Sequence, residues 1–345
     1  MHWMQERRKK SKKKSDQPRP RRDRRGDSRV RIAIIGAGRL GAALGRALGR
    51  AGYRIEVVVT RRPAQARKAA RLIGPGVLSL TPGQLGRLTR EQLDRLSRCD
   101  LILIATPDDV IGLAAAQFAA LLKARRRTSS DKGRVQRTAL HTSGALSSEI
   151  LGPLREAGFA IGSLHPLISV SDPVSGAEML RHAFFCVEGD RPAVRRARSI
   201  VRNLHGQSFT IEACKKGLYH ASAVTASGHL VALFDIALEM LTRCGLSPPR
   251  ARQVLLPLVK STMANLSTKP PVRALTGTFA RGDLATVRRH LAAIESEQLR
   301  DALAAYLLLG ARSIRLGQKA GASASELNKI AKLIRETARI KAFQS

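Results

Sequence analysis

The chain has few cysteines, few aromatic residues and no metal-ligand spacing. Its four cysteines form no C-x-x-C pair, which predicts reduced, mostly buried thiols and no disulfide; they are Cys99, Cys186, Cys214 and Cys244. No close-spaced set of histidine and acidic residues occurs, so we expect no metal site. Aromatic residues make up 3% of the chain, too few for a platform on which nucleic-acid bases stack.

Long apolar runs are also absent from the sequence. No run reaches the roughly 18 apolar residues that a helix needs to cross a bilayer. Residues 1–29 lack the apolar core of a signal peptide. We therefore expect a cytoplasmic protein with no membrane partner.

Acidic residues are scarce beside the basic ones. The chain has 26 Asp and Glu against 61 Lys and Arg, a net charge of +35. Residues 1–29 hold thirteen basic and four acidic residues, a net +9, which leaves +26 on the remainder. We predict that residues 1–28 form a disordered basic tail that aids solubility. Nucleic-acid binding by this tail is the weaker alternative, because no nucleic-acid-binding motif accompanies it.

The chain does have a hydrophobic content of 43% over 345 residues, enough for a sizeable core and about two domains. In residues 30–41 an apolar strand runs directly into G-x-G-x-x-G and an Ala- and Leu-rich helix. The three glycines of such a turn permit a tight bend, a close approach of backbone amides to a pyrophosphate, and close packing of helix on strand. The predicted dinucleotide-binding residues here are Gly36, Ala37, Gly38, Arg39, Leu40 and Gly41.

Strand and helix patterns alternate after this turn. Residues 55–59 and 100–105 are apolar runs typical of parallel strands buried on both faces, and further short runs up to residue 211 indicate about eight strands. From residue 213 onward, long segments have helical periodicity with no strand-like runs between them. We predict a doubly wound α/β domain of the Rossmann type at 29–212 and an all-α domain at 213–345.

The end of the second strand indicates which dinucleotide binds. An acidic residue there selects NAD, whereas hydroxyl and basic groups accommodate a 2′-phosphate. Glu56 lies too early in the strand for the acidic role, while Thr60, Arg61 and Arg62 supply a hydroxyl and guanidinium groups. We predict NADP(H).

The turn after the next apolar strand, Ala105, Thr106 and Pro107, is expected to border the cofactor.

Five segments in a fixed order carry a family resemblance. They read HTSGA at 141–145, SLHPL at 163–167, VEGD at 187–190, YHASA at 219–223 and LTGTFARGD at 275–283. Together they resemble a bacterial family of Rossmann-like oxidoreductases with a C-terminal helical domain of unknown function, from about residue 29 to the C-terminus. The resemblance implies a helical domain of the 6-phosphogluconate dehydrogenase type, as in ketopantoate reductase and pyrroline-5-carboxylate reductase. It also implies NADPH-dependent reduction of C=O or C=N bonds by a homodimer built through that domain.

One position departs from the family pattern. Gly228 stands where the family usually has an asparagine, so an amide expected to face the substrate is missing. A non-catalytic NADP(H)-binding sensor or assembly protein therefore stays open as an alternative to an enzyme.

Candidate catalytic residues are those that can donate a proton or hydrogen bond to a reduced substrate. Lys216 and His220 lie four residues apart on a predicted helix and so share a face. His141 and His165 each end a predicted strand at the carboxyl edge of the sheet, where ligands bind in such folds. For each histidine, a structural role in a turn is an equally open interpretation. Beside His141, Ser143 offers a hydroxyl for the cofactor or a carboxylate.

The family motif around residue 280 contributes the substrate candidates. Thr276 and Arg281 are predicted to reach an anionic substrate, because arginine binds a carboxylate through two hydrogen bonds. Asp283 is expected to cap the following helix. The sequence thus predicts an NADPH-dependent oxidoreductase acting on a small carboxylate-bearing carbonyl compound, such as a ketopantoate-like oxoacid, with an imine as the alternative substrate.

Overall fold

The structure is a computed structural model that describes residues 30–126 and 136–342. The prediction of a disordered tail at residues 1–28 lies outside these ranges. Contacts between Cα atoms divide the chain into two units, one ending at Ala221 and one beginning at Ser222. Each unit is described by itself.

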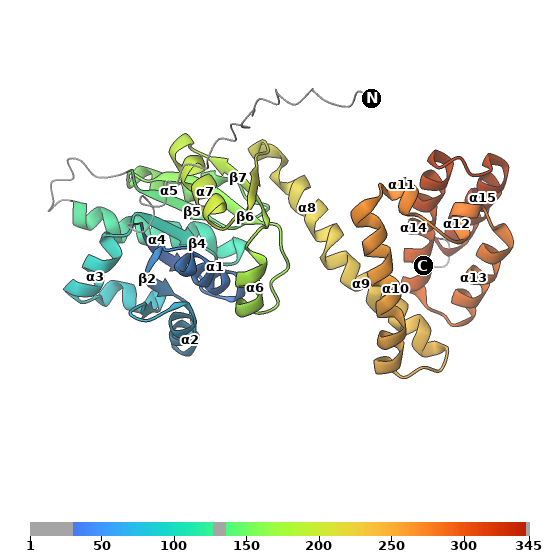
Figure 1. Cartoon of the computed structure of the whole chain (residues 1–345), viewed down its shortest axis with the longest axis horizontal. Helices are drawn as coiled ribbons and strands as arrows, with labels where there is room; N and C mark the ends of the chain where they lie inside the picture. The colour runs from blue at the N-terminus through green and yellow to red at the C-terminus, as the bar shows by residue number, and fades with distance from the viewer. Residues whose placement is uncertain (1–29, 127–135, 343–345) are drawn as a thin grey trace, which may run out of the picture. The chain divides into compact units, whose positions relative to one another are not determined.

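An eight-stranded sheet forms the centre of the first unit (Figure 1). The strand order is β3-β2-β1-β4-β5-β6-β7-β8, and every pairing is parallel except that of β6 with β7. This order reverses direction between β1 and β4, which is the doubly wound arrangement that the alternating strand and helix patterns predicted. The strands are β1 (Arg31–Ile35), β2 (Arg54–Val59), β3 (Leu78–Leu80), β4 (Leu101–Ile104), β5 (Thr138–His141), β6 (Ala160–Pro166), β7 (Phe184–Gly189) and β8 (Gln207–Phe209).

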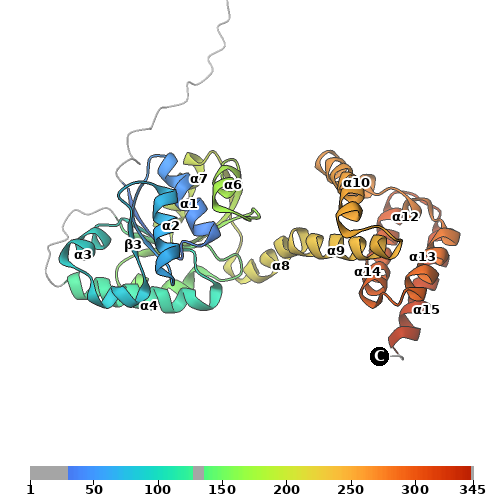
Figure 2. The same ribbon diagram turned by 90° about the horizontal axis from the view of Figure 1, so that it is seen from below.

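Helices cover both faces of this sheet (Figure 2). Successive residues of β1 alternate between two cores: Ile32 and Ile34 pack on one face, and Ala33 and Ile35 on the other. The first face carries α1, α2, α6 and α7, and the second carries α3, α4 and α5. The helices of the first unit are α1 (Arg39–Arg50), α2 (Pro63–Ile73), α3 (Arg90–Ser97), α4 (Asp108–Arg126), α5 (Gly152–Glu156), α6 (Pro173–Met179), α7 (Arg191–Asn203) and the start of α8 (Lys216–Ala226). Short 3-10 turns lie at η2 (Pro82–Arg87), η3 (Ser148–Leu151) and η4 (Ala213–Lys215).

The second unit is helical throughout its described residues. Its core is made by apolar side chains of α13, α14 and α15, with Ile236 and Met240 of α9 packed against it. Asp283 caps α13 by accepting a hydrogen bond from the Thr286 amide at 3.0 Å, as the sequence predicted. The helices are α9 (Gly228–Arg243), α10 (Pro248–Thr268), α11 (Pro271–Ala274), α12 (Thr278–Arg281), α13 (Leu284–Ser296), α14 (Arg300–Lys319) and α15 (Ala324–Ala342).

The division between the units falls later than the predicted boundary between residues 212 and 213. The first residues of α8 stay with the sheet because Lys216 is fully buried there. Among the described residues, one helical stretch, Ala213–Arg243, is long and apolar enough to cross a membrane by length and composition. The stretch is interrupted at Ser227, where α8 ends and α9 begins.

Candidate functional site

The glycine turn after β1 is tightly packed at its first and third glycines and open at its second. Gly36 has φ +89°, and a Cβ there would lie 2.6 Å from the Ala105 carbonyl carbon. A Cβ on Gly41 would collide with the Gly36 carbonyl oxygen. At Gly38, by contrast, a Cβ would meet no atom within 4 Å. The turn therefore packs tightly against the end of β4 and leaves open space beside Gly38, at the N-terminus of α1.

A hollow of about 460 Å³ lies above this turn, at the carboxyl edge of the sheet. Two polar atoms of its lining residues, the Thr106 hydroxyl oxygen and His220 Nδ1, are buried and have no hydrogen-bond partner among the described residues. Such orphaned groups are unusual in a folded protein and fit a ligand that supplies the missing partners. The lining residues are Gly38, Arg39, Leu40, Ala105, Thr106, Pro107, Asp108, Thr142, Ser143, Gly144, His165, Pro166, Ile168, Val170 and His220.

The residues after β2 differ in how far they are free to bind a phosphate. Thr60 is 6% exposed, and its hydroxyl donates to the Arg62 carbonyl at 3.0 Å. Arg61 and Arg62 are exposed at the end of the strand. A phosphate here would thus be held by the two guanidinium groups, while Thr60 shapes the turn that presents them.

Ser143 lines the hollow, but its hydroxyl is already used within the protein. The hydroxyl donates to a carboxylate oxygen of Asp108 at 2.8 Å and accepts from the amides of Ala145 and Leu146 at 3.1 and 3.0 Å. These bonds close the loop after β5 and tie it to the N-terminus of α4. Asp108 was not among the residues predicted from the sequence, although it lines the hollow as the partner of Ser143.

His141 lies behind the hollow and does not line it. Its side chain is fully buried, and its Nδ1 atom accepts a hydrogen bond from the Ser143 amide at 3.1 Å. Burial, reinforced by the charge of Lys216, lowers the pKa of His141 to about 3, so the imidazole is neutral at neutral pH. This position makes His141 a support for the Ser143 loop.

Lys216 is also beneath the hollow. It is fully buried at the start of α8, and its Nζ atom donates to the Ser143 carbonyl oxygen at 3.1 Å and to the Ser163 hydroxyl. Nζ also lies 3.6 Å from a Glu188 carboxylate oxygen, and Glu188 in turn accepts from the amide and hydroxyl of Ser148. Burial lowers the pKa of Lys216, while Glu188 opposes that shift. The network joins α8 to the loop after β5, to strands β6 and β7 and, through Glu188, to η3.

Two histidines from different elements meet in the wall of the hollow. His165 comes from β6 and His220 from α8, with their ring centroids 5.6 Å apart and their planes nearly perpendicular. His165 Nε2 and His220 Nδ1 both lie within 3 Å of the place that a Cβ on Gly144 would occupy. His165 Nδ1 is 2.6 Å from the Tyr219 hydroxyl oxygen. Sequence reasoning selected both histidines but did not select Gly144 or Tyr219, although each is adjacent to a selected residue.

Burial, together with the neighbouring His220 and Lys216, lowers the pKa of His165 to about 4. At neutral pH this imidazole is uncharged and has one donor and one acceptor nitrogen. Four residues were predicted as catalytic. His165 and His220 line the hollow, whereas His141 and Lys216 are buried behind it.

The predicted substrate residues Thr276 and Arg281 lie in the second unit. Arg281 ends α12 and is exposed, and Thr276 lies in the turn before that helix. Gly228 begins α9 and has Val224 Cγ1 as its near neighbour, 3.7 Å from an added Cβ. Their roles toward a substrate stay predictions.

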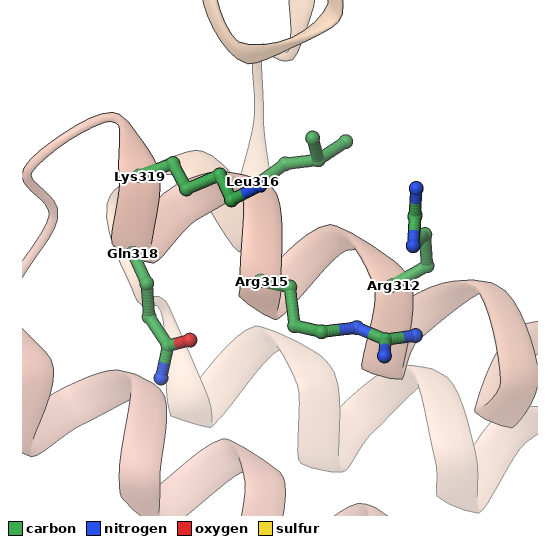
Figure 3. A pocket seen from close by; sticks show the side chains of 5 residues that line it. All are labelled: Arg312, Arg315, Leu316, Gln318 and Lys319. Atoms are coloured by element: carbon green, nitrogen blue, oxygen red, sulfur yellow. The ribbon is translucent and has the colours of Figure 1, made fainter.

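A second hollow, of about 350 Å³, lies on α14 in the second unit (Figure 3). Arginine, lysine, glutamine and leucine side chains from this one helix line it: Arg312, Arg315, Leu316, Gln318 and Lys319. This hollow contains no histidine, cysteine or carboxylate side chain among its lining residues. Among the described residues, no set of three or more His, Cys, Asp and Glu side chains is placed to hold a metal ion. The hollow above the glycine turn is therefore the candidate site.

Comparisons with known proteins agree with the two-part organisation. Residues 16–166 match the Rossmann-like domain, and residues 183–314 match the Domain of unknown function (DUF2520). The predicted fold, a Rossmann-type domain followed by a helical one, is thereby confirmed. No curated protein matches the sequence.

Several solved structures share the fold. A Bacteroides fragilis protein provisionally named an NADP oxidoreductase is 20% identical, with 83% of this chain and 98% of that chain covered and a TM-score of 0.62. A protein from Thermotoga maritima is 23% identical, with coverage of 84% and 98% and a TM-score of 0.59. The imine reductase from Myxococcus stipitatus, in complex with NADP+, is 16% identical, with coverage of 87% and 99% and a TM-score of 0.55. At these identities the likeness concerns the fold.

Proposed function

We propose that this chain, a Rossmann-like domain followed by a DUF2520 domain, is an NADP(H)-dependent oxidoreductase that reduces a small substrate at a carbonyl group. The observation that carries the proposal is one hollow with two kinds of wall. One wall holds the open Gly38 turn and the unpartnered Thr106 hydroxyl, and the other holds His165 and His220. A dinucleotide cofactor fits the first wall, and a reacting substrate fits the second.

The residues present fit NADP(H). The amides at the start of α1 and the open space beside Gly38 suit a pyrophosphate, because the first N–H groups of a helix have no intrahelical partner. Arg61 and Arg62, exposed after β2, suit a 2′-phosphate. When bound, the reduced cofactor would supply the hydride. Two of the similar structures support this assignment, since one is provisionally named an NADP oxidoreductase and the other is an imine reductase in complex with NADP+.

The chain's own contribution to the reaction is binding and polarisation of the substrate. His165 and His220 present ring nitrogens to one point in the hollow, where they can hold a carbonyl oxygen and stabilise the negative charge that develops on it. Lys216, predicted as a proton donor, instead holds the Ser143 loop from below, where it has no exposed surface. We assign it a positioning role.

The substrate class that we favour is a carboxylate-bearing oxoacid. Arg39 is the one cationic side chain among the described residues that line the hollow, and it belongs to the cofactor turn. A substrate carboxylate would therefore depend on the predicted Arg281 and Thr276 of the second unit. An imine is the second candidate, because the Myxococcus stipitatus structure is an imine reductase.

A homodimer built through the helical domain is the assembly that we propose. Large apolar side chains are exposed along α9 and α10, for example Val231 at 70% and Leu258 at 61%. A gathering of exposed large apolar side chains on two helices favours a protein interface there. A second copy of the chain is the proposed occupant, and we keep the cytoplasm as the proposed location.

Cofactor binding and turnover test the proposal separately. We expect the purified full chain to enhance NADPH fluorescence on titration and to oxidise NADPH with at least one member of a panel of 2-oxoacids and cyclic imines. His165→Gln is expected to lower turnover at least tenfold with NADPH affinity unchanged. His182→Gln, a change at an exposed residue outside the hollow, is the matched control.

The outcomes separate the alternatives. A chain that neither binds nor oxidises NADPH would overturn the proposal. Tight NADPH binding without turnover, unchanged in Lys216→Ala and His220→Ala, would favour a non-catalytic sensor or assembly protein. A salt-sensitive association with nucleic acid that is lost when residues 1–28 are removed would favour the basic tail as a nucleic-acid-binding segment.

A further inference from the structure

Tyr219 of α8 lies against two neighbouring side chains of the sheet. Its hydroxyl oxygen is 2.6 Å from His165 Nδ1, and the two rings meet edge to face with centroids 5.5 Å apart. It also makes a side-chain hydrogen bond with Cys186, which pairs with His165 across β6 and β7. The antiparallel pairing of these two strands places histidine and cysteine side by side under one phenol.

The direction of the hydrogen bond to His165 follows from the acceptors that Tyr219 can choose between. Burial raises the pKa of Tyr219, so the phenol keeps its single proton. That proton can go to an imidazole nitrogen or to the sulfur of Cys186. Sulfur is a weak acceptor, whereas an unprotonated imidazole nitrogen is a good one. The short distance of 2.6 Å also indicates a strong bond. Tyr219 therefore donates to His165 Nδ1.

This direction decides where the proton of His165 resides. Because the imidazole is neutral, with a pKa of about 4, and its Nδ1 accepts, Nε2 carries the hydrogen. Nε2 is the atom that faces the space over Gly144, where an added Cβ would lie 2.8 Å from it. His220 Nδ1 faces the same space and has no hydrogen-bond partner among the described residues. A donor and an unpartnered nitrogen thus converge where Gly144 has no side chain.

We propose that Tyr219 is a positioning residue that holds His165 in the Nε2–H form, so that His165 offers a hydrogen-bond donor to an acceptor atom of the substrate over Gly144. The acceptor is a carbonyl oxygen or an unprotonated imine nitrogen; a protonated iminium has no lone pair for this donor. This inference rests on the proposed reductase function for the identity of the substrate. The hydrogen-bond arrangement itself does not depend on it.

Histidine nitrogen-15 NMR on the full chain tests the arrangement without a substrate. With the His165 signals assigned from His165→Gln, we expect the chemical shifts of the wild-type chain to show a protonated Nε2 and an unprotonated Nδ1. In Tyr219→Phe the Nδ1 shift is expected to move and the Nδ1–H form to appear. Cys186→Ala, which removes only the weaker partner of Tyr219, is expected to leave the His165 shifts in place.

The chain supplies a matched control in its second unit. Tyr306 makes the same kind of contact with His290, with 2.8 Å between the hydroxyl oxygen and Nδ1 and rings edge to face at 5.8 Å. Tyr306→Phe should change the His290 shifts and leave those of His165 unchanged. Wild-type His165 in the Nδ1–H form, or His165 shifts that are the same in Tyr219→Phe, would overturn the inference.

Turnover supplies a second, separable measurement. With a substrate from the panel, Tyr219→Phe should lower kcat on the order of ten- to a hundredfold, the size of effect seen when the partner that orients a metal-binding histidine is removed. NADPH affinity should stay within about twofold. If no substrate is found, the reductase proposal fails while the NMR result still decides the role of Tyr219. If turnover is normal in Tyr219→Phe, the inference fails and the reductase proposal stands.

Discussion

Gly144 is the residue at which the two histidines of the hollow meet. A methyl group there would lie within 3 Å of a ring nitrogen of both His165 and His220. Neither ring can yield freely, because His165 is tied to Tyr219 and both rings are partly buried. The absence of a side chain at this one position therefore keeps the space over the histidines open.

Gly144→Ala is accordingly expected to displace the imidazoles and to lower kcat at least tenfold while leaving NADPH affinity within about twofold, an effect of misplaced catalytic groups. Steady-state kinetics and fluorescence titration measure the two quantities. Gly217→Ala, where an added Cβ meets nothing within 4 Å, is the control. Equal loss of cofactor affinity and turnover in Gly144→Ala would contradict the assignment of this wall to the substrate.

His141 predicts how stability depends on pH. Its pKa is about 3 in the folded chain and about 6.5 when unfolded, so between these values the unfolded state binds more protons. Stability is therefore full above pH 6.5 and falls as the pH drops, by up to about 1.4 kcal/mol per pH unit for this one group.

His141→Gln is expected to make the unfolding free energy less dependent on pH between 7.5 and 5.0. Urea unfolding followed by circular dichroism measures this, with His229→Gln, an exposed histidine, as the control. A His141→Gln chain with the wild-type pH slope would show that the imidazole is not protected from protons in the fold.

At the scale of the secondary-structure elements, the buried ammonium group of Lys216 holds α8 to the sheet through its ion pair with Glu188. The side chain of Lys216 is fully buried and that of Glu188 is 10% exposed. Removing one partner of a buried ion pair leaves the other charge uncompensated, which costs more than the pair itself contributes.

Lys216→Met should therefore destabilise the first unit by about 3–5 kcal/mol. The double variant Lys216→Met with Glu188→Gln should recover much of that loss, because the glutamine oxygen can still accept from the Ser148 amide and its NH2 group can donate to the Ser148 hydroxyl oxygen. Urea unfolding of the three chains measures both effects. A double variant no more stable than Lys216→Met would argue against the charge as the cause.

Two glycines of the turn between β1 and α1 are expected to affect different properties of the chain, Gly36 its stability and Gly38 its binding of NADPH. Gly36→Ala should destabilise the chain by about 1–3 kcal/mol, because its φ of +89° and its contact with Ala105 exclude a side chain. Gly38→Ala should leave stability nearly unchanged, since φ is −72° and the space is open, but weaken NADPH binding at least tenfold. Thermal unfolding and fluorescence titration distinguish them. Unweakened NADPH binding in Gly38→Ala would place the cofactor elsewhere.

The sequence predicted the elements whose causes are local. The strand, the three glycines and the start of the following helix lie within residues 30–41, and the roles of the glycines depend on backbone contacts within or close to this segment. The placement of His165 at the hollow also followed, because residues at the carboxyl ends of parallel strands share one edge. The burial of Lys216 could not be predicted from the sequence, because it depends on Ser143, Ser163 and Glu188, which are distant in sequence. The Tyr219 contact likewise requires a cross-strand register that periodicity does not contain.

For the whole molecule, the exposed apolar side chains of α9 and α10 predict self-association. We expect sedimentation to show a dimer of the full chain and Val231→Asp with Leu258→Asp to shift it toward monomer, because a charge in an apolar interface loses its hydration. Leu113→Asp, at an apolar residue of α4 that is 61% exposed, is the control and should leave the dimer intact. A wild-type chain that is monomeric at all accessible concentrations would contradict the proposed assembly.

The turn after β2, where we propose that the 2′-phosphate binds, has a different character from the wall that holds His165 and His220. Thr60 is buried, and its hydroxyl donates a hydrogen bond to the Arg62 carbonyl. The side chains of Arg61 and Arg62 are exposed and support no part of the core. A preference for one cofactor that depends on such side chains can be rewritten by substitution without risk to folding. It should also weaken as ionic strength rises. Cofactor choice in this fold is thus an evolvable trait, inherited separately from the architecture that carries it.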